Sequence, residues 1–439
     1  MKKIRIGLFG AGRGISLAQQ CQADGNAELV AVCDKFTATF EDLKAKVDTS
    51  NITFYSSFDE FIKHDMDAVL LANYATEHAP YAVRCLDAGL HVMSELLPCQ
   101  TMKQAVELVE AVERSGKIYA YAENCCFMKG PSEMTKLFRE GKIGEFEYAD
   151  CEYIHDLTPD AHIHTYGEAT HWRNTMYCTF YCTHSLGPII HVCAHSLGPI
   201  IPATGLRPVS VTGFEMPYRP KMAATAMRSG LAGVEMVTLE NGALIKSVHG
   251  NLPHYSLWYA MYGSKGTMET ARKISQNNDV DRIFTAFDEA ESMENDNPEN
   301  YIPVNSEFEE QMKKAGHSGA DFITVHNFID RLRGLDADII DVYEAMDMYL
   351  PGMFAYRSIL NGNIPMEVPN MRDPEVREKF RNDTTCVDPE VAGDMVIPSY
   401  SKGNPDIPEE FHARMKEKYR LFREEKTRKL REAETEKNK

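Results

Sequence analysis

Three closely spaced glycines follow the first apolar segment of the chain, and this arrangement constrains the fold more than any other feature. Residues 3–9 form an apolar run that predicts a buried strand, and the sequence Gly-Ala-Gly-Arg-Gly comes directly after it at residues 10–14. Residues 15–23 predict a helix, and residues 29–33 predict a second strand. The resulting order of strand, glycine turn, helix and strand is typical of a dinucleotide-binding fold.

Each glycine of this turn has a separate physical role. Gly10 permits the tight turn after the strand, and Gly12 lets the backbone approach a pyrophosphate at the helix N-terminus. The third glycine of the usual fingerprint is replaced by Ile15, with Gly14 directly before it. The turn alone is therefore a weak motif.

Asp34 strengthens the dinucleotide interpretation. It closes the second predicted strand about two dozen residues after Gly10, where a carboxylate can accept hydrogen bonds from both ribose hydroxyls of an adenosine. A carboxylate at this position repels a 2′-phosphate, so we expect NAD in preference to NADP.

Further strands and helices alternate along the first third of the chain. Strands are predicted at residues 68–72, 91–93 and 118–122, and helices begin at Pro80 and Met102. This alternation predicts an α/β domain with a doubly wound parallel sheet that ends near residue 125.

The charge balance and hydropathy of the 439 residues exclude several classes of function. Lys and Arg number 47 against 65 Asp and Glu, for a net charge of −18, so a cationic face for nucleic acid is not expected. No apolar run of about 18 residues predicts a membrane span. The N-terminus lacks the pattern of a signal peptide. We therefore expect a cytoplasmic protein that binds neither nucleic acid nor membrane.

The cysteines favour a reducing compartment. All eleven occur without paired CxxC motifs, which argues against a disulfide scaffold and against a structural zinc site. Buried thiols that pack as small apolar side chains are the expected role, and no metal is predicted.

Several short segments carry a resemblance to a known family. They are residues 67–98 (with Asn73, His78, Gly89-Leu90-His91-Val92 and Glu95), 123–126, 153–157, 181–188, 316–321 and 341–345. Together they resemble the Gfo/Idh/MocA family of NAD(P)-dependent sugar oxidoreductases. The resemblance is greatest to its branch of NAD-dependent, α-N-acetylgalactosaminidase-like glycoside hydrolases of family 109, and it covers about residues 3–370.

This resemblance implies three parts of the chain. Residues 1–125 would form the NAD-binding Rossmann domain. Residues 126–375 would form an α+β domain on a large, mostly antiparallel open sheet, which binds the substrate and often mediates homodimers or homotetramers. Residues 376–439 would be a C-terminal extension. Its segment from about residue 406 to 436 is dense in Glu, Lys and Arg, which predicts a solvated helix that packs on its own or a sister subunit.

Two positions depart from the family's dehydrogenases. Those enzymes carry Glu-Lys-Pro after the Gly-x-His-Val strand, and the lysine assists proton transfer, whereas residues 95–98 here are Glu-Leu-Leu-Pro. They also often place an aspartate four residues before the catalytic histidine, where this chain has Phe180. The family 109 branch likewise lacks the lysine, so a simple sugar dehydrogenase is disfavoured but stays open.

The resemblance also implies which residues form the site. His184 is the leading base for a substrate hydroxyl, and Tyr181 could share its proton; His249 and Glu152 are further catalytic candidates. Substrate binding is expected of His155, Asp156 and Tyr255. Cofactor binding is expected of Gly10, Gly12, Arg13, Gly14, Asp34, Asn73, His78, Glu95, Asn124, Trp172 and Arg173.

The implied function is NAD-dependent oxidation of a ring hydroxyl of a sugar or glycoside, at C3. The ketone would acidify the C2 hydrogen, a side-chain base would remove it, and the aglycone would leave from C1. Water would then add, and the hydride would return with no net redox change. The alternatives are a simple sugar or polyol dehydrogenase with exchangeable NAD, and a non-catalytic protein that binds NAD or a sugar.

A tandem repeat complicates the assignment of the base. The heptapeptide His-Ser-Leu-Gly-Pro-Ile-Ile occurs at residues 184–190 and again at 195–201. Prolines within both copies argue against one unbroken helix. We assign the function to His184 because Tyr181 and Thr183 precede it as in the family, whereas His195 follows Cys193-Ala194.

Overall fold

The computed structural model describes residues 2–194, 206–272, 281–287, 299–305 and 307–437. The second copy of the repeated heptapeptide, with His195, lies outside the described residues. So does most of the acidic stretch 288–299.

A six-stranded parallel sheet forms the first domain, in the order β3-β2-β1-β4-β5-β6. Its strands are β1 (Ile4–Phe9), β2 (Ala27–Cys33), β3 (Thr53–Tyr55), β4 (Ala68–Leu71), β5 (His91–Ser94) and β6 (Tyr119–Tyr121). Its helices are α1 (Ile15–Asp24), α2 (Thr39–Lys44), α3 (Phe58–Phe61), α4 (His78–Asp87) and α5 (Met102–Ser115). The strand order reverses between β1 and β4, which is the point at which such sheets bind ligands.

A nine-stranded sheet forms the second domain, in the order β14-β13-β12-β11-β7-β10-β9-β8-β15. Its ladders are antiparallel except for the parallel pair of β7 and β10. The strands are β7 (Phe146–Ile154), β8 (Pro208–Glu215), β9 (Ala232–Leu239), β10 (Leu244–Gly250), β11 (Ser256–Gly263), β12 (Gly266–Thr270), β13 (Ile283–Phe287), β14 (Glu299–Tyr301) and β15 (Met366–Glu367). The fold class expected from the sequence is confirmed.

Helices join the two sheets and cover them. The longer ones are α6 (Lys129–Arg139), α9 (Thr183–Ala194), α12 (Ala320–Leu332), α13 (Val342–Leu360), α14 (Pro374–Phe380) and α16 (Glu409–Lys437); the one-turn helices are α7 (Ala161–His164), α8 (Trp172–Thr175), α10 (Pro220–Ala223), α11 (Glu309–Met312) and α15 (Pro389–Ala392). Helix α13 packs on β8 and α9. Helix α12 returns to the first domain, where Val325, Phe328 and Ile329 join the core formed with α1.

Helix α9 holds the first copy of the repeat and runs through Pro188, so the proline does not end it. Proline has no N–H to donate to the carbonyl four residues earlier, which belongs to His184. The hydroxyl of Tyr259 donates to that carbonyl oxygen at 2.8 Å instead. The helix therefore continues because a neighbouring strand satisfies the freed acceptor.

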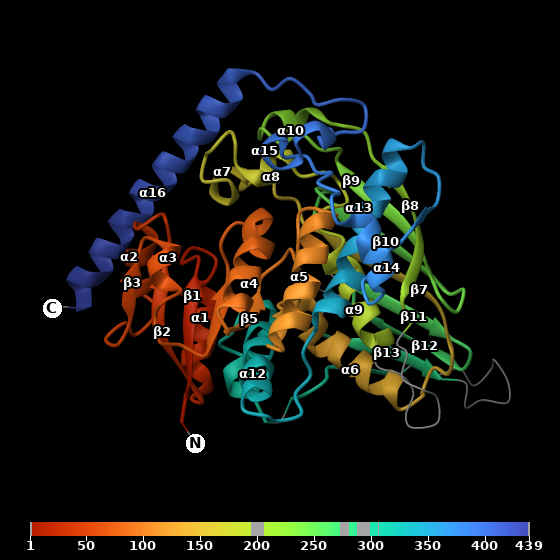
Figure 1. Cartoon of the computed structure of the whole chain (residues 1–439), viewed down its shortest axis with the longest axis horizontal. Coiled ribbons are helices and arrows are strands. Elements are labelled where there is room, and N and C mark those ends of the chain that lie inside the picture. The colour runs from red at the N-terminus through yellow and green to blue at the C-terminus, as the bar shows by residue number, and fades with distance from the viewer. Residues whose placement is uncertain (1, 195–205, 273–280, 288–298, 306, 438–439) are drawn as a thin grey trace.

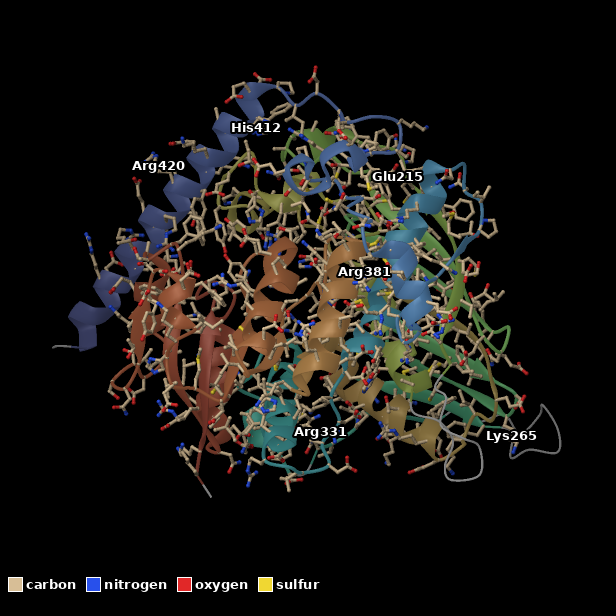
Figure 2. All side chains as sticks on the ribbon, viewed as in Figure 1. Glu215, Lys265, Arg331, Arg381, His412 and Arg420 are labelled. Carbon is tan, nitrogen blue, oxygen red and sulfur yellow. The ribbon has the colours of Figure 1, made fainter. Side chains whose placement is uncertain are left out.

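The charged C-terminal segment forms the long helix α16, as the sequence predicts. It leaves the second domain and runs along the edge of the first domain toward α2 and β3 (Figure 1). Charged side chains, Arg420 among them, extend from its outer side (Figure 2). Among the described residues, no helix is both long and apolar enough to cross a membrane.

Candidate active site

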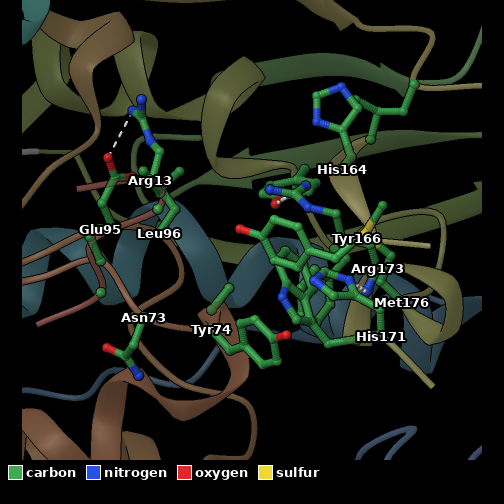
Figure 3. Close-up of a pocket in the computed structure, with 18 of the residues that line it drawn as sticks. Arg13, Asn73, Tyr74, Glu95, Leu96, His164, Tyr166, His171, Arg173 and Met176 are labelled. Carbon is green, nitrogen blue, oxygen red and sulfur yellow. Dashed lines mark hydrogen bonds and ion pairs between the residues drawn. The ribbon is translucent and has the colours of Figure 1, made fainter. Parts of the chain in front are cut away.

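A cavity of about 850 Å³ lies where the two domains meet, and residues of both domains line it. Gly10, Asp34 and Asn73 border it from the carboxyl ends of β1, β2 and β4. Figure 3 shows Arg13, Glu95 and Asn73 on the first domain's side, facing side chains of the second domain. The size and the position at the strand ends suit a small-molecule site.

The glycine turn approaches its neighbours so closely that larger residues would clash. Gly10 has φ +98°, and a Cβ there would lie 2.3 Å from the backbone carbon of Ala72. A Cβ at Gly14 would lie 2.4 Å from the carbonyl oxygen of Gly10. In the usual dinucleotide-binding fingerprint, the third glycine allows helix and strand to pack closely. Gly14 has this role here, one position before Ile15, which occupies the usual place of that glycine.

Asp34 is buried beside this turn. Its Oδ2 accepts a hydrogen bond from the N–H of Ala11 and its Oδ1 from the N–H of Phe36, both at 2.8 Å. Each carboxylate oxygen keeps a second lone pair for a ribose hydroxyl. Asn73 lines the same cavity, and both polar atoms of its amide are buried without a partner among the described residues. Buried polar atoms normally have partners, so Asn73 fits a bound polar ligand.

Arg13 and Glu95 form an ion pair in the cavity, with Nη2 of Arg13 2.7 Å from Oε1 of Glu95. This pair raises the pKa of Arg13. Leu96, which stands where the related dehydrogenases have lysine, lines the cavity with an apolar side chain. His78 is buried, with ring nitrogens 3.1 and 3.2 Å from the carbonyl oxygens of Leu97 and Asn73. Burial lowers the pKa of His78 to about 4, so the imidazole is neutral near pH 7 and its single N–H donates to only one of these two carbonyl oxygens.

His184 lines the cavity from the first turn of α9. Its Nδ1 lies 3.0 Å from Oε1 of Glu123, a fully buried residue two positions after the end of β6. Its ring stacks on Tyr153 and Tyr181, with centroids 4.4 and 5.6 Å away. If Nδ1 donates to this carboxylate oxygen, Nε2 is the ring nitrogen that can accept a proton. This arrangement suits His184 to accept a proton from a ligand in the cavity.

Tyr181, Trp172 and Arg173 form a connected group beside His184. The guanidinium of Arg173 donates to the hydroxyl of Tyr181 at 2.6 Å. It also lies over the ring of Trp172, 4.4 Å from the ring centroid. All three line the cavity, together with the expected substrate ligands His155 and Tyr255.

Two histidines on the second domain's side, His155 and His164, are neutral near pH 7. Burial is the main cause that lowers the pKa of His155 and of His164 to about 4. Nδ1 of His155 lies 2.9 Å from the hydroxyl of Tyr153. Neutral imidazoles can accept a proton from a substrate, which imidazolium ions cannot.

His249 lines the cavity from β10 and is almost fully buried. Its Nε2 is 3.9 Å from Oε1 of Glu235, which is fully buried on β9. Burial lowers the pKa of His249 to about 3 and raises that of Glu235 to about 8. The two groups therefore meet as a neutral imidazole and a protonated carboxyl near neutral pH.

Two expected site residues lie apart from the others. Glu152 is not among the residues that line the cavity, because side chains alternate along β7 and Tyr153 faces the cavity. Arg272 holds Glu152 through two hydrogen bonds of 2.9 and 2.6 Å. Asp156 also lies outside the lining, 3.0 Å from the ammonium of Lys221. The structure therefore does not bring Glu152 and Asp156 to the site where the sequence analysis expected them.

A third histidine–carboxylate pair, between His317 and Asp321, was not identified from the sequence. Nδ1 of His317 lies 2.9 Å from Oδ1 of Asp321, and Asn124 donates to the same oxygen at 2.7 Å. The bond to Asp321 raises the pKa of His317, which lines the cavity. His317 and Ser318 both have positive φ, of 51° and 55°, and strain of this kind clusters at functional sites.

Glu123 and His184, together with Cys125 of the cavity lining, also have the chemistry of metal ligands. One ligand atom each from Glu123, Cys125 and His184 lie within 4.8 Å of one another. A metal ion bound by these three atoms would replace the hydrogen bond between His184 and Glu123. The His184–Glu123 hydrogen bond and a bound metal ion therefore exclude each other. The sequence analysis predicts no metal.

Two protein families match the chain over consecutive regions. "Oxidoreductase family, NAD-binding Rossmann fold" matches residues 4–123, and "Glycosyl hydrolase 109, C-terminal domain" matches residues 131–375. A glycosyl hydrolase family 109 protein from Phocaeicola vulgatus is 25% identical over 395 residues, covering 84% of this chain and 83% of that protein. An alpha-N-acetylgalactosaminidase from Tannerella forsythia is 25% identical over 428 residues, covering 84% and 86%.

Solved structures share the fold. An oxidoreductase from Agrobacterium radiobacter, in complex with NAD⁺, L-tartaric acid and magnesium, has a TM-score of 0.65 at 12% identity, covering 84% of this chain and 99% of its own. The WlbA dehydrogenase from Bordetella pertussis, in complex with NADH and UDP-GlcNAcA, has a TM-score of 0.62 at 18% identity, covering 84% and 98%. Since the glycosyl hydrolase 109 match spans more than half of the chain, the protein is an NAD-dependent enzyme that belongs to glycosyl hydrolase family 109.

Proposed function

We propose that the protein acts on a glycoside and oxidises a ring hydroxyl at C3 as the first step of a redox-neutral cleavage. The observation that carries this proposal is that the His184–Glu123 pair faces the same cavity as Asp34 and the glycine turn. Bound NAD supplies an acceptor and later a donor for hydride. The relative from Tannerella forsythia is named for cleavage of such a bond.

His184 is the group that takes the hydroxyl proton. Oxidation of a secondary alcohol needs a base, because a free alkoxide is too unstable near neutral pH. Leu96 cannot serve, whereas His184 of the second domain lines the cavity with an imidazole. Glu123 holds the imidazole in one tautomer and stabilises the imidazolium that forms.

A second base is needed once the ketone has formed, since the C2 hydrogen must be removed before the aglycone leaves. His155 and His249 line the cavity as neutral imidazoles and suit this step. His317, whose pKa is raised, suits protonation of the departing oxygen. The second base then returns its proton to C2 as water adds, with its hydroxyl at C1 and its remaining proton on His317. Return of the hydride to C3, with the proton that His184 held, restores the hydroxyl and balances the reaction as a hydrolysis.

A panel of nitrophenyl glycosides tests the proposal, with each sugar assayed with and without added NAD. Release of nitrophenol without net NADH supports redox-neutral cleavage. Stoichiometric NADH would show a simple sugar or polyol dehydrogenase, and absence of both products across the panel would show a non-catalytic binding protein. Either of these two results contradicts the proposal.

We further propose that the protein is cytoplasmic and forms a homodimer or homotetramer. The family resemblance of its open sheet supports the assembly, and its buried free cysteines suit a reducing compartment. Light scattering coupled to size-exclusion chromatography measures the assembly directly, and a monomeric mass at micromolar concentration would contradict it.

A further inference from the structure

Helix α16 lies outside both regions matched by the families, yet it reaches the cofactor cavity. It begins at Glu409, whereas the matched regions end at residue 375. Tyr419 and Arg423, in its middle, line the same cavity as Asp34. The helix therefore contributes to a site that the two matched domains would otherwise form alone.

One side of α16 packs against the second domain. Met415 is buried in the main core, and Phe422 contacts His162 of α7 with ring centroids 6.3 Å apart. Gly167 lies directly against the helix, because a Cβ there would come within 2.9 Å of the Cα of Lys416. This spacing leaves no gap between α16 and the loop that carries Gly167.

The neighbouring residue in that loop connects α16 to the glycine turn. Tyr166 contacts Tyr419 with ring centroids 5.9 Å apart. Its hydroxyl lies against Gly12, 3.2 Å from the position that a Cβ would take. Tyr166 is therefore held between the cofactor-binding turn and α16, and its backbone adopts a positive φ of 53°.

The same helix is tied to the first domain by two cations on one carboxylate. Asp42 of α2 is 2.7 Å from Nη1 of Arg423 and 2.9 Å from Nζ of Lys426. Asp42 is mostly buried, and α2 starts shortly after Asp34 at the carboxyl end of β2. These ion pairs link the two domains across the end of the cavity where Asp34 lies.

We propose that α16 is a strap over the Asp34 end of the cofactor cavity, which retains bound NAD by opposing separation of the two domains there. Asp34 marks the end that binds the adenosine ribose, so the strap lies over the adenosine half of the cofactor. NAD release requires the strap to loosen, which requires the pairs of Asp42 with Arg423 and Lys426 to break. The strap concerns cofactor retention and does not depend on which sugar the enzyme acts on.

The test measures the release rate of cofactor without turnover. Wild-type protein is loaded with NADH, mixed with excess NAD, and followed by the loss of bound NADH fluorescence. The double variant Arg423→Glu/Lys426→Glu should release NADH at least tenfold faster, and the milder Asp42→Asn should act in the same direction. A matched control is Arg420→Glu, since within the described part of the chain Arg420 pairs only with Glu417 and Glu424 of its own helix.

A charge exchange separates the strap from general damage to the fold. Asp42→Lys combined with Arg423→Glu/Lys426→Glu restores opposite charges across the contact and should return slow release. Thermal unfolding of each variant confirms that the chain is folded. Release at the wild-type rate in Arg423→Glu/Lys426→Glu, or fast release that the charge exchange fails to slow, would overturn the proposal.

Discussion

The hydroxyl of Tyr259 donates a hydrogen bond of 2.8 Å to the carbonyl oxygen of His184. Pro188 makes this bond necessary, because it cannot supply the usual helical donor to that carbonyl. Tyr259 belongs to β11, so the strand anchors the turn of α9 that carries His184, the proposed base. The position of His184 is thus fixed at its backbone by Tyr259 and at its ring by Glu123.

We expect Tyr259→Phe to lower the free energy of unfolding by about 1–3 kcal/mol, the cost of a buried acceptor that loses its donor. The loss should be smaller in a Pro188→Ala background, because an alanine at this position supplies the helical N–H that proline lacks. Urea denaturation of the four variants in this cycle measures both costs. Equal losses in the two backgrounds would show that Tyr259 does not replace the missing helical donor.

His184→Ala should lower turnover by about 10² to 10⁴, the usual scale of general base catalysis, while NAD binding stays unchanged. His195→Ala is the matched control, since His195 stands in the identical heptapeptide and should matter little. If His195→Ala abolishes activity and His184→Ala does not, the second copy supplies the base.

Glu123→Gln should lower turnover by about 10²-fold or more, because an amide cannot hold His184 in the required tautomer and charge state. The pH profile of kcat should change along with the rate. A purely structural role would instead lower the thermal midpoint and leave the pH profile of the remaining activity as in the wild type.

Asp34→Ala should weaken NAD binding and reduce discrimination against NADP, because the carboxylate that accepts ribose hydroxyls and repels a 2′-phosphate is gone. Titration of both cofactors into the variant measures the two effects. Mass analysis of the ligand released by denatured wild-type protein should give NAD. A bound 2′-phosphorylated cofactor would contradict the assignment.

Glu235 should make the enzyme less stable in mildly alkaline solution. Burial raises its pKa from 4.5 to about 8, so the folded protein binds this proton more tightly than the unfolded chain does. Its contribution to stability is complete below about pH 4.5 and is lost as the pH rises toward 8. Glu235→Gln should remove this part of the pH dependence. The same pH dependence of the unfolding midpoint in both proteins would show that Glu235 titrates normally.

The first domain was predictable because local patterns determine it. Apolar runs, the glycines at residues 10–14 and Asp34 gave the strand–turn–helix–strand unit with boundaries within a few residues. Gly14 also explains why Ile15 is tolerated, since the close packing simply occurs one residue earlier. The sequence alone could not show this shift, because it depends on the distance between helix and strand.

The second domain shows where sequence reasoning fails. Glu152 was expected at the site as a catalytic candidate, but alternation along β7 turns it toward Arg272. Glu123 of the first domain was not predicted as a site residue either, although its place just after β6 was a usable signal, since ligands bind at the carboxyl ends of such strands.

Pairing between distant segments could not be predicted at all. The charge pattern of α16 predicted a solvated helix, and only the folded chain brings Arg423 to Asp42, more than 300 residues earlier. His249 and Glu235 likewise meet only because β9 and β10 pair. The sequence around either residue of such a pair does not indicate which distant residue it will contact.

Hydrogen exchange at C2 of the sugar tests the central claim most directly. The enzyme is incubated with a cleaved nitrophenyl glycoside in deuterated water, and the released sugar is examined by NMR. Removal and return of the C2 proton by a side chain that exchanges with solvent predicts deuterium at C2, and His184→Ala should lose labelling and cleavage together because no ketone forms. Sugar released at the full rate with hydrogen retained at C2 would show direct hydrolysis and contradict the redox mechanism.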